Sequence, residues 1–155
     1  MGVDETKEVY AEIAKKFSMP DFMSIEKELE ISNLDANKFL LRAIRNKIKS
    51  RLETYTDMIE DILHPDASVA SMHELTYIND VFKQKAFKLY KKLMYMQRTG
   101  EYLDIEKSNR KDAKFIKQYF DHISYINQEM KKIIKARMNT WTKQISEEMR
   151  EVYFG

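Results

Sequence analysis

Glycine and proline are scarce in this chain, and this scarcity limits the possible folds more than any other feature of the sequence. Its 155 residues contain only three glycines and two prolines, Pro20 and Pro65. A β-rich fold needs turn residues about every 8–12 positions, so this composition favours long helices. The length is sufficient for one domain with a real core. We therefore expect an all-α fold, with residues 1–155 forming a single helical domain.

Two long amphipathic segments predict an antiparallel helix hairpin. They span about residues 35–63 and 72–98, and both repeat apolar residues at steps of three and four. The apolar positions are Leu41, Ile44, Ile48, Leu52, Tyr55, Ile59 and Ile62 in the first, and Leu75, Ile78, Phe82, Ala86, Leu89, Leu93 and Met96 in the second. Stripes of matching spacing pack well on each other, and a short connection makes the helices antiparallel neighbours. Gly100 suits the left-handed position that would end the second helix.

Further helices are predicted on both sides of this hairpin. Residues 4–17 form an amphipathic segment that Pro20 stops, and a short helix over 24–31 opens at the capping residue Ser24. After Gly100, Ser108 or Asn109 can cap a last helical region of about residues 109–154, which contains no glycine or proline.

The length of the C-terminal region suggests a partner surface. As one helix it would be roughly 65–70 Å long, whereas the hairpin helices would be roughly 40 Å. Either it breaks near Asn139-Thr140, or residues 139–155 extend beyond the bundle and pack on a partner. The apolar stripe that would then need covering is Trp141, Ile145, Met149 and Val152. Because an exposed apolar stripe of this length marks an interaction site, we expect self-association or a protein partner there.

Motifs of known chemistries are missing from the sequence. Without cysteine there can be no disulfide and no thiolate metal site. Glycine-rich phosphate loops, nucleophile elbows and His-Glu-x-x-His motifs do not occur. The nearest approach to a di-iron motif is Asp61-x-x-His64, which is present once, at a helix end. We therefore expect no enzymatic activity, no cofactor and no metal; a metal-binding bundle enzyme is the least favoured alternative.

Basic residues at helical spacing favour a second alternative, a nucleic-acid-binding module. The candidates lie in two sets: Lys38, Arg42, Arg45 and Lys49, and Lys85, Lys88 and Lys92. Such stripes could follow a phosphate backbone. They are more often typical of the outer faces that keep a helical bundle soluble, and the isoelectric point near 8.6 is below the usual basic footprint.

Hydropathy gives an expectation about location. No apolar run approaches the roughly 18–20 residues of a transmembrane helix, and the acidic N-terminal segment differs from a signal peptide. We expect a cytoplasmic protein without a membrane partner.

Over residues 4–125 the chain resembles the α-helical domain of the GINS replication proteins, accessory subunits of the replicative helicase. The resemblance rests on the acidic N-terminal helix, on Asp35-x-x-x-Phe39 and on the run Phe87-Lys88-Leu89-Tyr90-Lys91-Lys92-Leu93. That family usually adds a small β-rich domain, whereas residues 126–155 here are predicted to be helical. The resemblance implies an intracellular scaffold of helical protomers without catalytic residues. The predicted function is accordingly a non-enzymatic interaction or scaffold protein, with a DNA-replication accessory role as its specific form.

Overall fold

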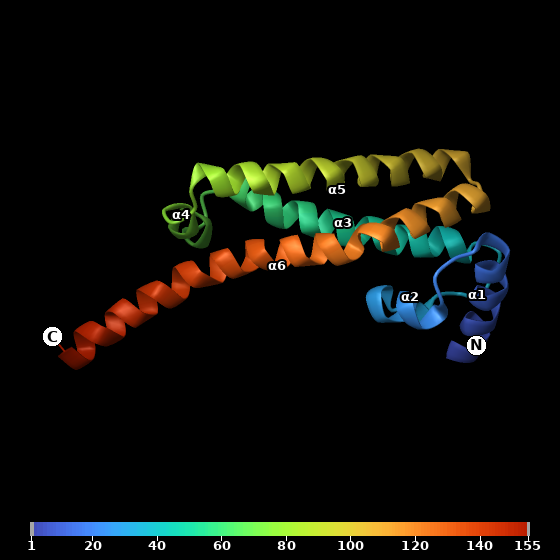
Figure 1. Cartoon of the computed structure of the whole chain (residues 1–155), viewed down its shortest axis with the longest axis horizontal. Coiled ribbons are helices and arrows are strands. Elements are labelled where there is room, and N and C mark those ends of the chain that lie inside the picture. The colour runs from blue at the N-terminus through green and yellow to red at the C-terminus, as the bar shows by residue number, and fades with distance from the viewer. Residues whose placement is uncertain (1, 155) are drawn as a thin grey trace. The chain divides into compact units, whose positions relative to one another are not determined.

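Helices account for most of the described chain, as the scarcity of turn residues predicts. The computed structural model describes the backbone of residues 2–154 and the side chains of residues 2 and 4–142. Within these residues the elements are α1 (Val3–Phe17), α2 (Phe22–Leu29), a 3-10 turn η1 (Ile31–Asn33), α3 (Leu40–Leu63), α4 (Val69–Leu75), α5 (Asp80–Glu106) and α6 (Asn109–Phe154) (Figure 1). No strand occurs in the described backbone. The all-α helical bundle is therefore confirmed.

The chain divides into two compact units, and the three long helices contribute to both. Unit 1 comprises Met1–Glu53 and Met94–Ser124, and unit 2 comprises Thr54–Leu93 and Tyr125–Gly155. The prediction of a single domain over residues 1–155 stays a prediction. None of the described helices combines the length and the apolarity needed to cross a membrane.

Each unit has an apolar core built from the predicted stripes. In unit 1 the fully buried side chains include Tyr10, Ile25, Ile31, Leu40, Ile44, Ile48, Leu52 and Tyr119. In unit 2 the buried positions include Ile59, Ile62, Ala86, Leu89, Leu93, Ile126, Met130 and Ile133. Burying such side chains contributes about 1.5–3 kcal/mol each relative to leaving them exposed. The helical periodicity therefore identifies the core faces of α3 and α5 correctly.

The beginnings of several helices differ from the prediction because short polar side chains cap them elsewhere. Asp21 caps α2, accepting a hydrogen bond of 2.8 Å from the Ser24 amide, so the helix starts before Ser24. Asn37 accepts from the Phe39 amide at 2.8 Å and holds a turn, so α3 begins at Leu40 and the predicted start at residue 35 is wrong. Asx turns of this kind compete with helical hydrogen bonding.

The predicted helix 72–98 is wrong at both ends. Its first residues belong to the separate helix α4, which Ser68 caps through the Ser71 amide. Asn79 then accepts from the Phe82 amide at 2.9 Å, at the start of α5. At the other end α5 continues through Gly100 to Glu106, and Lys107, with a φ of 53°, takes the left-handed position that we had predicted for Gly100.

Gly100 is buried inside α5 because another helix passes close to it. A Cβ at this position would lie 2.8 Å from Cγ and 3.0 Å from Cδ of Lys49 on α3. The glycine thus permits a close approach of side chain to backbone within unit 1, and its conformational freedom is not used.

The sequence of α6 supports one uninterrupted helix. Ser108 accepts a hydrogen bond from the Lys111 amide at 3.3 Å, as expected of a cap, and the helix runs from Asn109 to Phe154. The break near Asn139-Thr140, one of the two possibilities that the sequence left open, does not occur. Within unit 2 the C-terminal part of α6 continues past α4, and no other helix lies beside it in Figure 1.

Replacing Gly100 tests this packing. Alanine normally stabilises a helix interior by about 0.5–1 kcal/mol over glycine. Here we expect Gly100→Ala to lower the free energy of unfolding by about 1 kcal/mol or more, because the added methyl group overlaps the Lys49 side chain. Urea denaturation followed by circular dichroism measures the change.

The control is the same substitution in a Lys49→Ala background. With the Lys49 stem removed, Gly100→Ala should become stabilising, which a double-mutant cycle detects as coupling. If Gly100→Ala stabilised the parent chain and the Lys49→Ala variant equally, the close approach would be contradicted.

Candidate functional site

The basic half of α3 contacts other elements of unit 1. Lys47 Nζ donates to the Leu29 and Glu30 carbonyls at 3.2 and 2.7 Å, and Arg51 donates to the Glu28 carbonyl at 2.7 Å. These carbonyls belong to the C-terminal end of α2, where a helix carries partial negative charge. Lys47 and Arg51 of α3 therefore have hydrogen-bond partners at the C-terminal end of a different helix.

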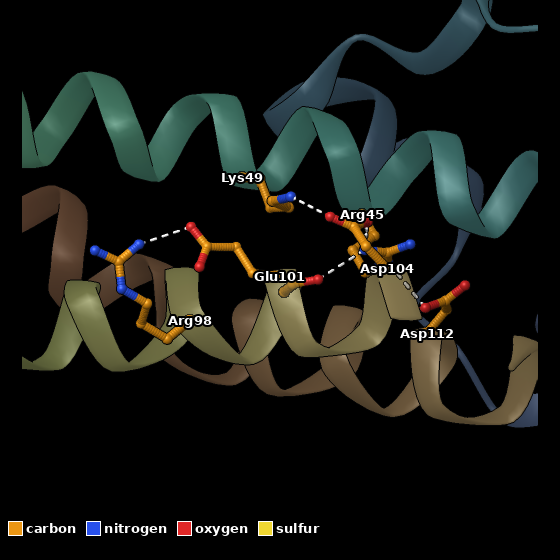
Figure 2. A network of polar contacts seen from close by, with 7 residues as sticks. Arg45, Lys49, Arg98, Glu101, Asp104 and Asp112 are labelled. Atoms are coloured by element: carbon orange, nitrogen blue, oxygen red, sulfur yellow. Dashed lines mark hydrogen bonds and ion pairs between the residues drawn. The ribbon is translucent and has the colours of Figure 1, made fainter. Parts of the chain in front are cut away.

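Arg45 is the centre of a buried polar network (Figure 2). Its side chain is 0% exposed, yet it carries a full charge. One guanidinium nitrogen donates to the Gly100 carbonyl at 2.8 Å and to Asp104, and Nε lies 2.8 Å from a carboxylate oxygen of Asp112. Lys49 reaches Asp104 as well, at 2.6 Å. The network thus joins α3, α5 and the first turn of α6 within unit 1.

The two carboxylates of this network respond differently to their surroundings. Burial raises the pKa of Asp112 from its ordinary value, although the neighbouring Arg45 guanidinium opposes the change. At Asp104 burial also acts to raise the pKa, but hydrogen bonds from Lys49 and Arg45 outweigh it and the pKa is lowered. The difference follows from exposure, because Asp112 is buried whereas Asp104 lies at the surface.

The structure separates the candidate nucleic-acid-binding residues into two classes. Arg45 and Lys49 pair with carboxylates inside unit 1, so these two residues do not present free basic groups beside Lys38 and Arg42. Nucleic-acid binding by the four residues stays a prediction. Lys38 and Arg42 remain near the surface, with their charged groups 5.0 and 4.7 Å from the centre of the Phe39 ring.

The second set of candidate nucleic-acid-binding residues, on α5, lies at the surface. Lys85, Lys88 and Lys92 are all exposed on α5 in unit 2. Lys92 Nζ lies 5.0 Å from the centre of the Tyr125 ring, an attraction between cation and aromatic face.

A buried carboxylate in unit 2 holds α6 against α4. Glu74 is only 8% exposed and accepts hydrogen bonds from Arg137 Nε at 2.9 Å and from the Trp141 indole at 2.8 Å. A second guanidinium nitrogen of Arg137 lies 2.8 Å from the same carboxylate, and the His73 ring is 4.2 Å from the Trp141 ring. Sequence reasoning missed this cluster, since Glu74 and Arg137 are 63 residues apart and lie on no common pattern.

Of the four candidate partner-binding residues, only Trp141 has a described side chain. It is 37% exposed and combines the contact with Glu74 with an apolar ring surface. Ile145, Met149 and Val152 lie outside the residues whose side chains are described, but their backbone continues α6 beyond Trp141. The steps of four, four and three place the four residues on one stripe of that helix.

The Asp61-x-x-His64 half-motif does not gather further ligands. Asp61 is 3.9 Å from Arg137, and His64 is exposed just after the end of α3. In the part of the chain with described side chains, no three acidic or histidine residues come together as a metal site.

The pKa values of the Arg45 network predict opposite pH dependences for its two acids. Because the pKa of Asp112 is raised on folding, this group adds stability below the ordinary aspartate pKa of about 3.9, and that stability is lost as the pH rises through the folded-state value. The free energy of unfolding of the parent minus that of Asp112→Asn should therefore decrease between about pH 3 and pH 7. Urea denaturation at each pH measures it.

Asp104→Asn is the matched control, with the reverse sign. The lowered pKa of Asp104 adds stability that is present above the ordinary pKa and is lost as the pH falls through the folded-state value. The free energy of unfolding of the parent minus that of Asp104→Asn should therefore increase between about pH 2 and pH 5. A trend of the same sign for both variants would contradict the distinction between the two sites.

Compared with models of known families, with curated proteins and with solved structures, the chain gives no significant match.

Proposed function

We propose that this chain is a non-enzymatic helical interaction protein that self-associates through the C-terminal part of α6. The observation that carries the proposal is the continuity of α6, which runs as one helix to Phe154. Its last described anchor to the rest of unit 2 is the hydrogen bond between Trp141 and Glu74.

The physical reason is that such an extension needs a partner. The thirteen residues after Trp141 extend the helix by roughly 20 Å at 1.5 Å per residue. A helix this short is marginal in water unless tertiary contacts stabilise it. The apolar stripe Trp141, Ile145, Met149 and Val152 supplies a surface for those contacts, and a second copy of the chain presents the same stripe.

A scaffold role in DNA replication is the more specific form of this proposal. It is supported by the resemblance of residues 4–125 to the helical domain of the GINS proteins in helix order and charge. In such a role α6 would join protomers or accessory subunits, and no residue of the chain would act on a substrate.

The alternative of nucleic-acid binding is supported by one observation. Lys85, Lys88 and Lys92 are exposed on α5 at helical spacing, so they can reach phosphates without rearrangement. Arg45 and Lys49, by contrast, would have to leave their carboxylate partners.

Self-association predicts a specific effect of charge on the stripe. Analytical ultracentrifugation should find the parent chain as a dimer or larger species at ~200 µM, a concentration at which micromolar interfaces are saturated. We expect Ile145→Asp/Met149→Asp to weaken association by about 100-fold or more, because two carboxylates would have to be buried at the interface.

The control variant is Lys143→Ser/Arg150→Ser, which alters the net charge by the same amount on the opposite side of the helix. It should associate like the parent. A parent chain that is strictly monomeric at this concentration would rule out self-association.

A salt titration tests the nucleic-acid alternative. If the three lysines bind phosphates, duplex or single-stranded DNA should bind at about 50 mM salt, with a slope of roughly −2 to −3 in the plot of log K against log salt. Lys85→Glu/Lys88→Glu/Lys92→Glu should then abolish binding in a fluorescence anisotropy assay.

Lys114→Glu/Lys131→Glu/Lys135→Glu is the control, because it changes the same charge at exposed positions of α6. Absence of binding by the parent at about 50 mM salt would remove the alternative, since electrostatic contacts are strongest there.

A further inference from the structure

Unit 2 has a second surface with recognisable chemistry, at the C-terminal end of α3. An open hollow of about 580 Å³ lies where α3 ends beside α5. It is lined by Glu60, Asp61, Leu63, His64, Phe87 and Tyr90. None of these residues takes part in the proposed association through α6.

Two aromatic rings form part of the hollow. The Phe87 and Tyr90 rings are stacked, with centres 6.2 Å apart and planes 21° from parallel, and Phe87 is 47% exposed. Lys91 Nζ lies 5.3 Å from the centre of the Phe87 ring, so this ring already attracts one ammonium group of the chain. The exposed part of Phe87 is the ring surface that a second ammonium group would meet.

Two of the other four lining residues are acidic. Glu60 and Asp61 are exposed, and Glu60 accepts a hydrogen bond from the Tyr90 hydroxyl at 2.5 Å, which holds the carboxylate beside the rings. The nearest cation to Asp61, Arg137, is 3.9 Å away and leaves half of that side chain exposed. The C-terminal end of α3 adds the partial negative charge of a helix terminus.

We propose that this hollow docks a lysine side chain of a protein partner, with an apolar residue beside that lysine. The ammonium group takes the position between the Phe87–Tyr90 faces and the carboxylates of Glu60 and Asp61. Its alkyl stem packs on the apolar atoms of Leu63 and Phe87, as long basic side chains do at mixed surfaces. Charge complementarity selects this occupant, because the same carboxylates repel a phosphate backbone.

Small peptides test the proposal on the full-length chain. The probe is acetyl-Leu-Lys-Leu-amide, titrated into ¹⁵N-labelled protein while the amide chemical shifts of residues 60–64 and 87–90 are followed. We expect saturable shifts confined to these residues. The analogue with norleucine in place of lysine should bind at least about five-fold more weakly, since it lacks the charge. Equal binding of the two peptides would overturn the assignment.

Three further measurements decide between this site and simpler explanations. Glu60→Gln/Asp61→Asn should weaken lysine-peptide binding by about five- to ten-fold, whereas Asp121→Asn, which removes an exposed carboxylate on the unit 1 part of α6, should not. n-Butylammonium should bind more weakly than the peptide; if it binds equally tightly, the hollow is an amine site and not a docking surface.

Absence of any chemical-shift change, or changes spread over the whole chain, would also overturn the proposal. Because the hollow is separate from the C-terminal stripe, a monomeric protein can still bind the peptide.

Discussion

Unit 1 depends most on the interactions of one buried group, the guanidinium of Arg45. A charge without water is costly unless it is paired and hydrogen-bonded, and breaking a buried pair by removing one partner typically costs about 3–5 kcal/mol. Arg45 donates to the Gly100 carbonyl and to Asp104 and forms an ion pair with Asp112, while its Nε and its second terminal nitrogen are buried without a hydrogen bond. These partners belong to α5 and α6, so the packing of three helices is fixed by one side chain. Asp104 lies on α5 beyond residue 98, so the network requires this helix to continue past that point. Lys49, which also reaches Asp104, passes close to α5 at Gly100, where a larger residue would overlap it.

The same network shows why part of the site could not be predicted. Periodicity alone identified the apolar faces, because hydrophobic spacing reports directly on burial. The absence of glycine and proline indicated a helical region over residues 109–154 but left open whether it breaks near Asn139-Thr140. The spacing of Lys38, Arg42, Arg45 and Lys49, however, describes only one helix, and the acids that pair with Arg45 are 59 and more residues away in the sequence. A basic stripe without nearby acids is ambiguous in principle, because its counter-charges can be solvent ions, a ligand or another segment of the same chain.

The predicted boundaries of the helices were wrong for a related reason. Gly100 and Asn79 are residues with two structural uses each, and the local sequence does not choose between them. Glycine ends helices through a positive φ but also permits close helix contacts, and the burial of Gly100 against Lys49 shows the second use. Asparagine is tolerated inside a helix but caps one better, and the hydrogen bond to the Phe82 amide selects the cap. In both cases a tertiary or capping interaction decided what propensity left open.

In unit 2, too, a buried charged side chain joins two helices, and this contact fixes where the C-terminal part of α6 begins to extend. Glu74 receives Arg137 and the Trp141 indole, so α6 is held against α4 as far as residue 141. A carboxylate satisfied by two donors of one helix fixes the direction of that helix as well as its position. The following residues of unit 2 continue α6 in the same direction to Phe154. For the proposed self-association this continuity matters, because residues held in a helix lose less conformational entropy on association than the same residues in a disordered tail.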